Sequence, residues 1–290
     1  PTDVAGQAIE AIEGDDPVLD ARLLAESSPP PIAVLSGSNE WDYAPYTRPD
    51  PLKATRWFWD PLRDSKAGGM GQLGAAVTAR VAPLLGFCGG AQILALLEAR
   101  GSTPAAVDDQ ALIDLVLKRI NGRPIRGFAT ARDMEWDWPS DPHPRRARVS
   151  FVPSDPLFSD LAGAELRDST QALPEAHSDA VRPDAFLPGA PLGAFDVLAT
   201  SRFCGADVVA AGPRDGVVPG PRASTWCDTV TETFRSRGDR WPLIGTQFHA
   251  EQRQFVAPAP GDPPESVDDP RLFIAGAFEE IVDAYERLAR

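Results

Sequence analysis

Residues 83–97 read PLLGFCGGAQILALL, in which a short apolar run meets a Gly-x-Cys-x-Gly step and continues with helical spacing. The pattern predicts a buried strand, a sharp turn at Cys88 and a helix. Gly86 and Gly90 leave the room that a Cβ would fill in such a turn. Cys88 would lie at the helix N-terminus, where unpaired N–H groups and the helix dipole favour a thiolate. The N–H of Gly89 would point at a developing oxyanion.

Residues 241–251, WPLIGTQFHAE, predict a short apolar strand that runs into a His-x-Glu pair. Residues two apart on an extended chain point to the same face, so His249 and Glu251 can lie side by side. Glu251 would orient the imidazole, and His249 would accept the thiol proton of Cys88. The two stretches together predict a Cys-His-Glu triad at the ends of two strands. Taken alone, Cys88 is equally compatible with a small buried core cysteine.

The order of these motifs resembles the class I glutamine amidotransferases. Residues 86–92 (GFCGGAQ) and 245–251 (GTQFHAE) are similar to the family patterns G-x-C-x-G-x-Q and G-x-Q-F-H-x-E. Between them, residues 176–181 (AHSDAV) resemble the H-x-D-x-V segment of the GMP-synthetase-like branch. The resemblance covers residues 32–255. It implies an α/β fold with a three-layer, flavodoxin-like sheet and helices on both faces, which the strand–helix alternation also fits.

The resemblance also implies a reaction and a substrate pocket. Cys88 would attack the side-chain amide of glutamine or a γ-glutamyl compound and form a thioester, which water would release as glutamate. Gln92, His177 and Asp179 would shape the pocket around the amino and carboxylate ends of this small-molecule substrate. Asp179 has a physical reason for that role, because a carboxylate pairs with an α-ammonium group. No cofactor is expected.

The sequence predicts an N-terminal extension followed by one domain. Residues 1–31 carry two helical patterns and end in three prolines, which stop a helix, so we expect a helical extension. Residues 32–290 are expected to form the amidotransferase-like domain. Its first clear strand, 32–35, is either the first strand of the sheet or the strand whose loop at Gly37 gives a second oxyanion donor. The second placement is favoured, although the family's Gly-Gly-Pro loop is missing.

Composition excludes several other classes of function. The 290 residues carry a net charge of −14, which argues against a nucleic-acid or anionic-membrane surface. Three histidines without a Cys-x-x-Cys motif predict no metal site, and no stretch approaches the ~18 apolar residues of a membrane span. Three cysteines are too few for a disulfide framework, so Cys204 and Cys227 either pair or pack. We expect a cytoplasmic protein, although the start at Pro1 is compatible with a removed leader.

Three functions remain as alternatives. The first is a glutamine amidotransferase subunit that works with a synthetase partner chain. The second is a γ-glutamyl peptide hydrolase of the same fold, in which the aromatic segments 41–59 and 136–138 bind a larger leaving group. The third is a catalytically silent binding or regulatory homologue.

Residues 104–121 predict a further helix, because their apolar residues recur at helical spacing.

Overall fold

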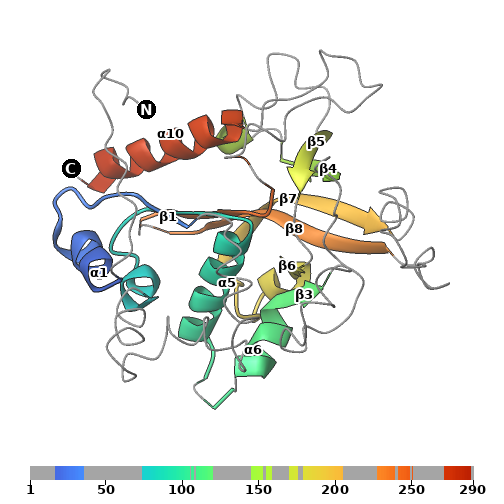
Figure 1. Ribbon diagram of the computed structural model, residues 1–290, viewed down its shortest axis with the longest axis horizontal. Helices are drawn as coiled ribbons and strands as arrows, with labels where there is room; N and C mark the ends of the chain where they lie inside the picture. Colours follow the sequence, from blue (N-terminus) through green and yellow to red (C-terminus); the bar gives the residue numbers. More distant parts are fainter. Residues whose placement is uncertain are drawn as a thin grey trace, which may run out of the picture.

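A mixed β-sheet lies between layers of helices (Figure 1). The computed structural model describes residues 17–35, 74–104, 106–107, 109–119, 145–152, 155–158, 170–175, 179–204, 227–238, 241–248, 250 and 271–288. Within them the main path of the sheet runs β1 (Ala33–Leu35), β2 (Leu84–Phe87), β9 (Leu243–Thr246), β8 (Cys227–Ser236), β7 (Phe195–Cys204), β4 (Arg145–Phe151) and β5 (Thr170–Glu175). Two short strands complete it, with β6 (Asp179–Val181) pairing both β3 (Leu117–Arg119) and β8.

Three parallel strands form one half of the sheet. β2 lies between β1 and β9, with Leu35 opposite Gly86 and Phe87 opposite Thr246. All four residues of β2 and of β9 are buried, as expected of strands covered on both faces. Because parallel strands end at the same edge, the chain leaves β1, β2 and β9 at neighbouring points.

The strands in the other half of the sheet pair in antiparallel fashion. β8 pairs with β9 through Thr233–Thr246, and the long β7–β8 pair follows. The β7–β8 register shifts where Ala199 pairs with Thr233 but Thr200 pairs with Thr231. Such a bulge bends a strand and redirects its side chains.

Helices cover both faces of this sheet. Figure 1 shows α5 (Gly89–Ser102) and α6 (Asp109–Val116) on one side and α10 (Arg271–Leu288) on the other. Successive residues of a strand point to opposite faces, so Leu84 packs with the α5 side and Leu85 with the α10 side. On the α10 side the short η1 turn (Pro156–Phe158) adds Phe158, which stacks on Phe151. The predicted three-layer α/β arrangement is therefore confirmed.

The remaining helical elements join the ends of the chain to this frame. α1 (Pro17–Glu26) is one of the two helices expected before residue 31. Residues 1–16 lie outside the described part, and the division into an extension 1–31 and a domain 32–290 stays a prediction. The Tyr285 hydroxyl of α10 donates to the Pro30 carbonyl, and the Tyr285 ring packs against Trp241. A second short turn, η2 (Pro183–Phe186), follows β6. No helix in the described ranges is both long and apolar enough to cross a membrane.

One predicted helix ends early. The helix expected over 104–121 is wrong in its bounds, because α6 stops at Val116. The next three residues form β3 and pair with β6, with Leu117 opposite Val181. Backbone pairing with a distant strand thus overrides the helical spacing of the apolar residues.

A three-member ion cluster ties α10 to the sheet. Arg235 of β8 donates to both oxygens of Asp155, at 2.8 and 3.1 Å, and to Glu280 of α10 at 2.9 Å. The three side chains are 9 to 21% exposed, so their charges are largely removed from water. Burial raises the pKa of Glu280, against the opposing effect of Arg235.

Replacing Arg235 with Met leaves two partly buried carboxylates without a counter-charge. We expect the free energy of unfolding to fall by about 2–3 kcal/mol, below the range of a fully buried broken pair. The matched control is Arg237→Met, whose partner Asp196 is 40% exposed and whose loss should cost less than about 1 kcal/mol. Urea unfolding of both variants measures the difference, and equal losses would contradict a structural role for the cluster.

The raised pKa of Glu280 predicts a pH dependence. A folded-state pKa above the unfolded value contributes stability that is present at low pH and lost as pH rises through the folded pKa. Glu280→Gln removes this titration, so we expect the variant to gain stability relative to the wild type as pH rises through the folded pKa of Glu280. Urea unfolding at several pH values measures the gain, with the exposed neighbour Glu279→Gln as the control for one lost charge on α10.

Candidate functional site

Cys88 forms the turn between β2 and α5, in an unusual backbone conformation. Its φ is 48° and its ψ is −115°, a region that costs a non-glycine residue about 1–3 kcal/mol. Its N–H donates to the Thr246 carbonyl at 2.8 Å, and its carbonyl accepts the Gln92 N–H at 3.2 Å. The side chain is buried and not in a disulfide. The backbone around Cys88 is thus held by the end of β9 on one side and by the first turn of α5 on the other.

The glycines on both sides of Cys88 allow this turn. A Cβ on Gly86 would lie 2.7 Å from Leu94 Cδ1 and 2.9 Å from the backbone of Ala91. A Cβ on Gly90 would lie 2.0 Å from the Leu35 carbonyl oxygen, closer than any real contact. Gly90 therefore lets the start of α5 pack against the end of β1. Both glycines leave the room in the turn that the sequence predicts.

The end of β9 meets the first turn of α5 through a pair of buried amides. Gln92 Nε2 donates to Gln247 Oε1 at 3.2 Å, although the two residues are 155 positions apart. Gln92 is 5% exposed and Gln247 is 2% exposed. Phe248 then packs edge-on against Phe273 of α10. The segments that carry the two sequence motifs therefore converge at one edge of the sheet.

Several predicted site residues lie outside the described part of the chain. These are His249, Glu251, His177 and Gly37, so the triad and the second oxyanion donor stay predictions. Gly89 is the first residue of α5 and is buried beside Cys88. Asp179 begins β6, opposite Arg119 of β3, and α5 contacts β6. The pocket roles of Gln92 and Asp179 also stay predictions.

A buried polar group near this edge was missed by the sequence reasoning. Glu232 is 0% exposed, and Ser201 of β7 donates its hydroxyl to Glu232 Oε1. The Glu232 carbonyl also accepts the Gln247 N–H at 2.7 Å. The available signal was a charged residue inside the strand-forming run TVTETF, residues 229–234.

The site edge combines a helix N-terminus with buried polar side chains. The first turn of α5 carries no acidic residue, so nothing on the helix itself opposes the positive end of its dipole. In the part of the chain that the structure describes, no three His, Cys, Asp or Glu side chains gather as a metal site would require. The arrangement suits a thiolate nucleophile whose developing oxyanion is met by backbone N–H groups.

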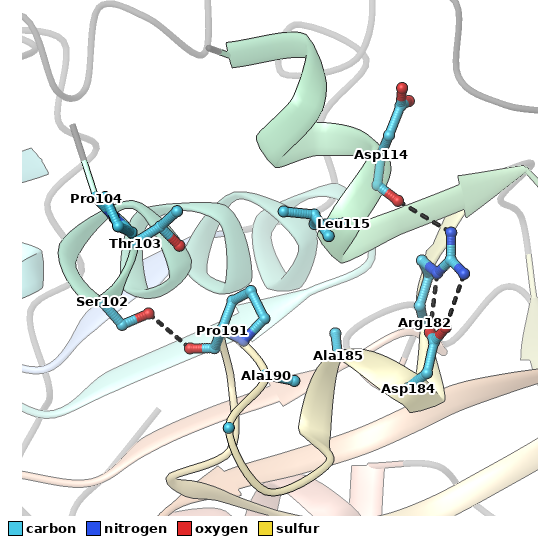
Figure 2. Close-up of a pocket in the computed structure, with 11 residues that line it drawn as sticks. Ser102, Thr103, Pro104, Asp114, Leu115, Arg182, Asp184, Ala185, Ala190 and Pro191 are labelled. Atoms are coloured by element: carbon cyan, nitrogen blue, oxygen red, sulfur yellow. Dashed lines mark hydrogen bonds and ion pairs between the residues drawn. The ribbon is translucent and has the colours of Figure 1, made fainter. Parts of the chain in front are cut away.

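A separate cavity lies at the other end of α5. Figure 2 shows it between Ser102, Leu115 and Pro191, with Arg182 paired to Asp184 at its rim. Its volume is about 440 Å³. A helix of 14 residues is about 20 Å long, so this cavity does not belong to the Cys88 edge.

Substitution of Gly90 tests the close approach to β1. Gly90→Ala would force the Leu35 carbonyl and α5 apart, and we expect a loss of more than about 3 kcal/mol in the free energy of unfolding. The control is Gly101→Ala in the last turn of the same helix, where the nearest atom is a methyl of Thr78 at 3.0 Å. That change should stay within about 1 kcal/mol. Thermal unfolding followed by circular dichroism would contradict the prediction if both variants melted alike.

Comparisons with known proteins give low similarities. No protein family model and no curated protein matches the sequence. Among solved structures, a putative GMP synthase subunit protein from Thermoplasma acidophilum is similar at 16% identity and a TM-score of 0.43, over 94% of this chain and 82% of that one. The glutaminase domain of Trypanosoma brucei CTPS, with bound acivicin, is similar at 12% identity and a TM-score of 0.45, over 92% and 77%. Neither structure defines the activity of this chain.

Proposed function

We propose that the protein is a glutamine amidotransferase-like hydrolase that releases ammonia, or an amine, and glutamate from glutamine or a γ-glutamyl compound. The observation that carries the proposal is the backbone of Cys88, with φ at 48° between two glycines that admit no Cβ. A strained residue at a strand–helix junction is the backbone arrangement of a nucleophile elbow. The strand bonded to Cys88, β9, leads within three residues to the imidazole of His249.

The proposed reaction needs one proton acceptor and one source of oxyanion stabilisation. His249 takes the Cys88 proton, and the sulfur attacks the amide carbon of the substrate. The Gly89 N–H stabilises the oxyanion, and the amine leaves with the proton returned by His249. Water then attacks the γ-glutamyl thioester and restores the thiol, with His249 as the base. Glu251 holds the imidazole in the required orientation.

One physical effect supports a thiolate at Cys88, and burial opposes it. The N-terminus of a helix favours a negative charge by about 0.3–1 kcal/mol, and more where the site is partly buried. Cys88 is only 4% exposed, and a buried charge needs a counter-charge nearby. The His249 imidazolium would supply it, so the sulfur and the imidazole would be charged together.

The end of β1 supports the placement of Gly37 in the second oxyanion donor. Leu35 is the last residue of β1 and touches the Gly90 position, so the chain that continues to Gly37 leaves the sheet beside the Cys88 turn. A second backbone N–H at that point would share the oxyanion with Gly89. The pocket for the amino and carboxylate ends of the substrate would include Gln92, His177 and Asp179.

Glutamate release from purified protein tests the proposal. We expect release from glutamine, from γ-glutamyl dipeptides or from both, and the preferred substrate distinguishes an amidotransferase from a γ-glutamyl peptide hydrolase. Cys88→Ala should lower kcat by about a thousandfold or more, because no other group can form the thioester. Cys227→Ala serves as the control. Cys227 is the first residue of β8, six positions before Thr233, where the pairing of β8 with β9 begins.

His249→Ala should match the loss of Cys88→Ala, and Glu251→Gln should lose less, because an orienting group contributes less than the base that it orients. Glutamate release that persists in Cys88→Ala would contradict the proposal. A wild-type protein that hydrolyses neither substrate would favour the catalytically silent alternative. Ammonia that stays enzyme-bound until an acceptor is added would indicate a synthetase partner chain.

A further inference from the structure

Glu232 is a buried carboxylate that the proposed reaction does not use. It is 0% exposed, and its neighbours Thr231 and Thr233 are buried with it. Taking an ionised carboxylate out of water costs several kcal/mol unless it is paired and hydrogen-bonded. A chain that keeps such a group inside a sheet therefore gains something from its local contacts.

The backbone places Glu232 in the bulge between β7 and β8. Thr233 pairs with Ala199 and Thr231 with Thr200, so no residue of β7 stands opposite Glu232. The Ser201 hydroxyl donates to Glu232 Oε1 and ties the bulged residue to the neighbouring strand. Because the β7–β8 register pairs no residue of β7 with Glu232, this side-chain bond is what holds the bulged residue to β7.

The bulge in turn holds the end of β9. The Glu232 carbonyl accepts the Gln247 N–H at 2.7 Å, one residue beyond the last residue of β9. On the other side of β9, the Thr246 carbonyl accepts the Cys88 N–H at 2.8 Å. The point where the chain leaves the sheet toward His249 is thus held from both neighbouring strands.

A hydrogen-bonded path continues from this point to the nucleophile. Gln247 Oε1 accepts from Gln92 Nε2, and the Gln92 N–H donates to the Cys88 carbonyl. Adjacent strands lie about 4.8 Å apart, so two strand spacings put the backbones of Glu232 and Cys88 roughly 10 Å apart. At that distance Glu232 acts through the strand between them and not by touching the substrate.

We propose that Glu232, held by Ser201, is a positioning residue for the reaction. The pair fixes the bulge, the bulge fixes Gln247, and Gln247 sets where His249 meets Cys88, two residues further along the chain. The inference rests on the proposed glutamine hydrolysis. Misplacing a reacting group by about 1 Å costs on the order of a hundredfold in rate, so the effect belongs in kcat and not in substrate binding.

Steady-state kinetics with glutamine test the role in Glu232→Met, which removes the acceptor oxygens at similar side-chain length, and in Ser201→Ala, which removes the donor. We expect kcat to fall about tenfold to a hundredfold in each, with KM within about threefold of the wild-type value. Because both changes break one link, the double variant should lose about as much as the stronger single variant. Ser201→Ala is the milder substitution and carries the test if Glu232→Met does not fold.

The matched control is Thr231→Val, one residue away on β8. Its hydroxyl is buried and has no hydrogen-bond partner among the described residues, so its removal changes the packing of the same strand without touching the link. We expect its kcat within about twofold of wild type. An equal fall in all three variants would assign the effect to packing and overturn the positioning role.

Alkylation of Cys88 by iodoacetamide separates this inference from the proposed function. Because His249 would withdraw the thiol proton, the reaction should slow in Glu232→Met and Ser201→Ala but not in Thr231→Val. If the wild type releases no glutamate, the proposed function fails, and slower alkylation alone still supports the positioning role. If the wild type is active and both variants keep its kcat and its alkylation rate, the positioning role is overturned.

Discussion

The hydrogen bond from the Cys88 N–H to the Thr246 carbonyl is the constraint on which the site depends. It extends the β2–β9 ladder by one residue beyond Phe87, so a residue with a strained backbone still has a fixed place relative to β9. A lone strained residue would relax, because about 1–3 kcal/mol favours an ordinary conformation. Three features require the same turn at Cys88. They are the bond to β9, the bond from the Gln92 N–H to the Cys88 carbonyl, and the two nearby glycines. Together they outweigh that cost.

The buried part of the sheet changes from apolar to polar toward the ends of β2 and β9. Along β2 and β9, neighbouring leucine and isoleucine side chains enter opposite apolar cores, one under α5 and one under α10. Around the ends of the same strands the buried residues are polar: Thr246 and Gln247 at the end of β9, Gln92 in α5 and Glu232 in β8 are each at most 5% exposed. Buried polar groups are tolerated where hydrogen bonds meet them, and the amide pair and the Ser201 contact provide such bonds. The sheet thus changes from a packing surface to a polar site within one or two residues.

Local features of the chain were predictable from the sequence, and non-local ones were not. The strand, turn and helix of residues 83–97 follow from neighbouring residues, because glycine spacing and helical periodicity act over a few positions. The adjacency of β1, β2 and β9 joins residues near 34, 85 and 244, and only the predicted Cys-His-Glu triad and the family resemblance anticipated that two of these ends meet. The helix beyond Val116 was wrong because its residues pair with β6 instead. Glu232 escaped notice because a bulge breaks the alternation from which a buried face is normally inferred.

The approach of Gly90 to the Leu35 carbonyl is a contact between main chains, and this determines how the region tolerates change. Side chains along β1 can be exchanged among strand-forming residues while the carbonyl keeps its place, since the closest atom is a backbone oxygen. The insertion or deletion of one residue in β1 would instead slide that oxygen by about 3.3 Å along the strand. Length in this segment is therefore under tighter constraint than residue identity, so homologous chains would drift in β1 composition while keeping its register.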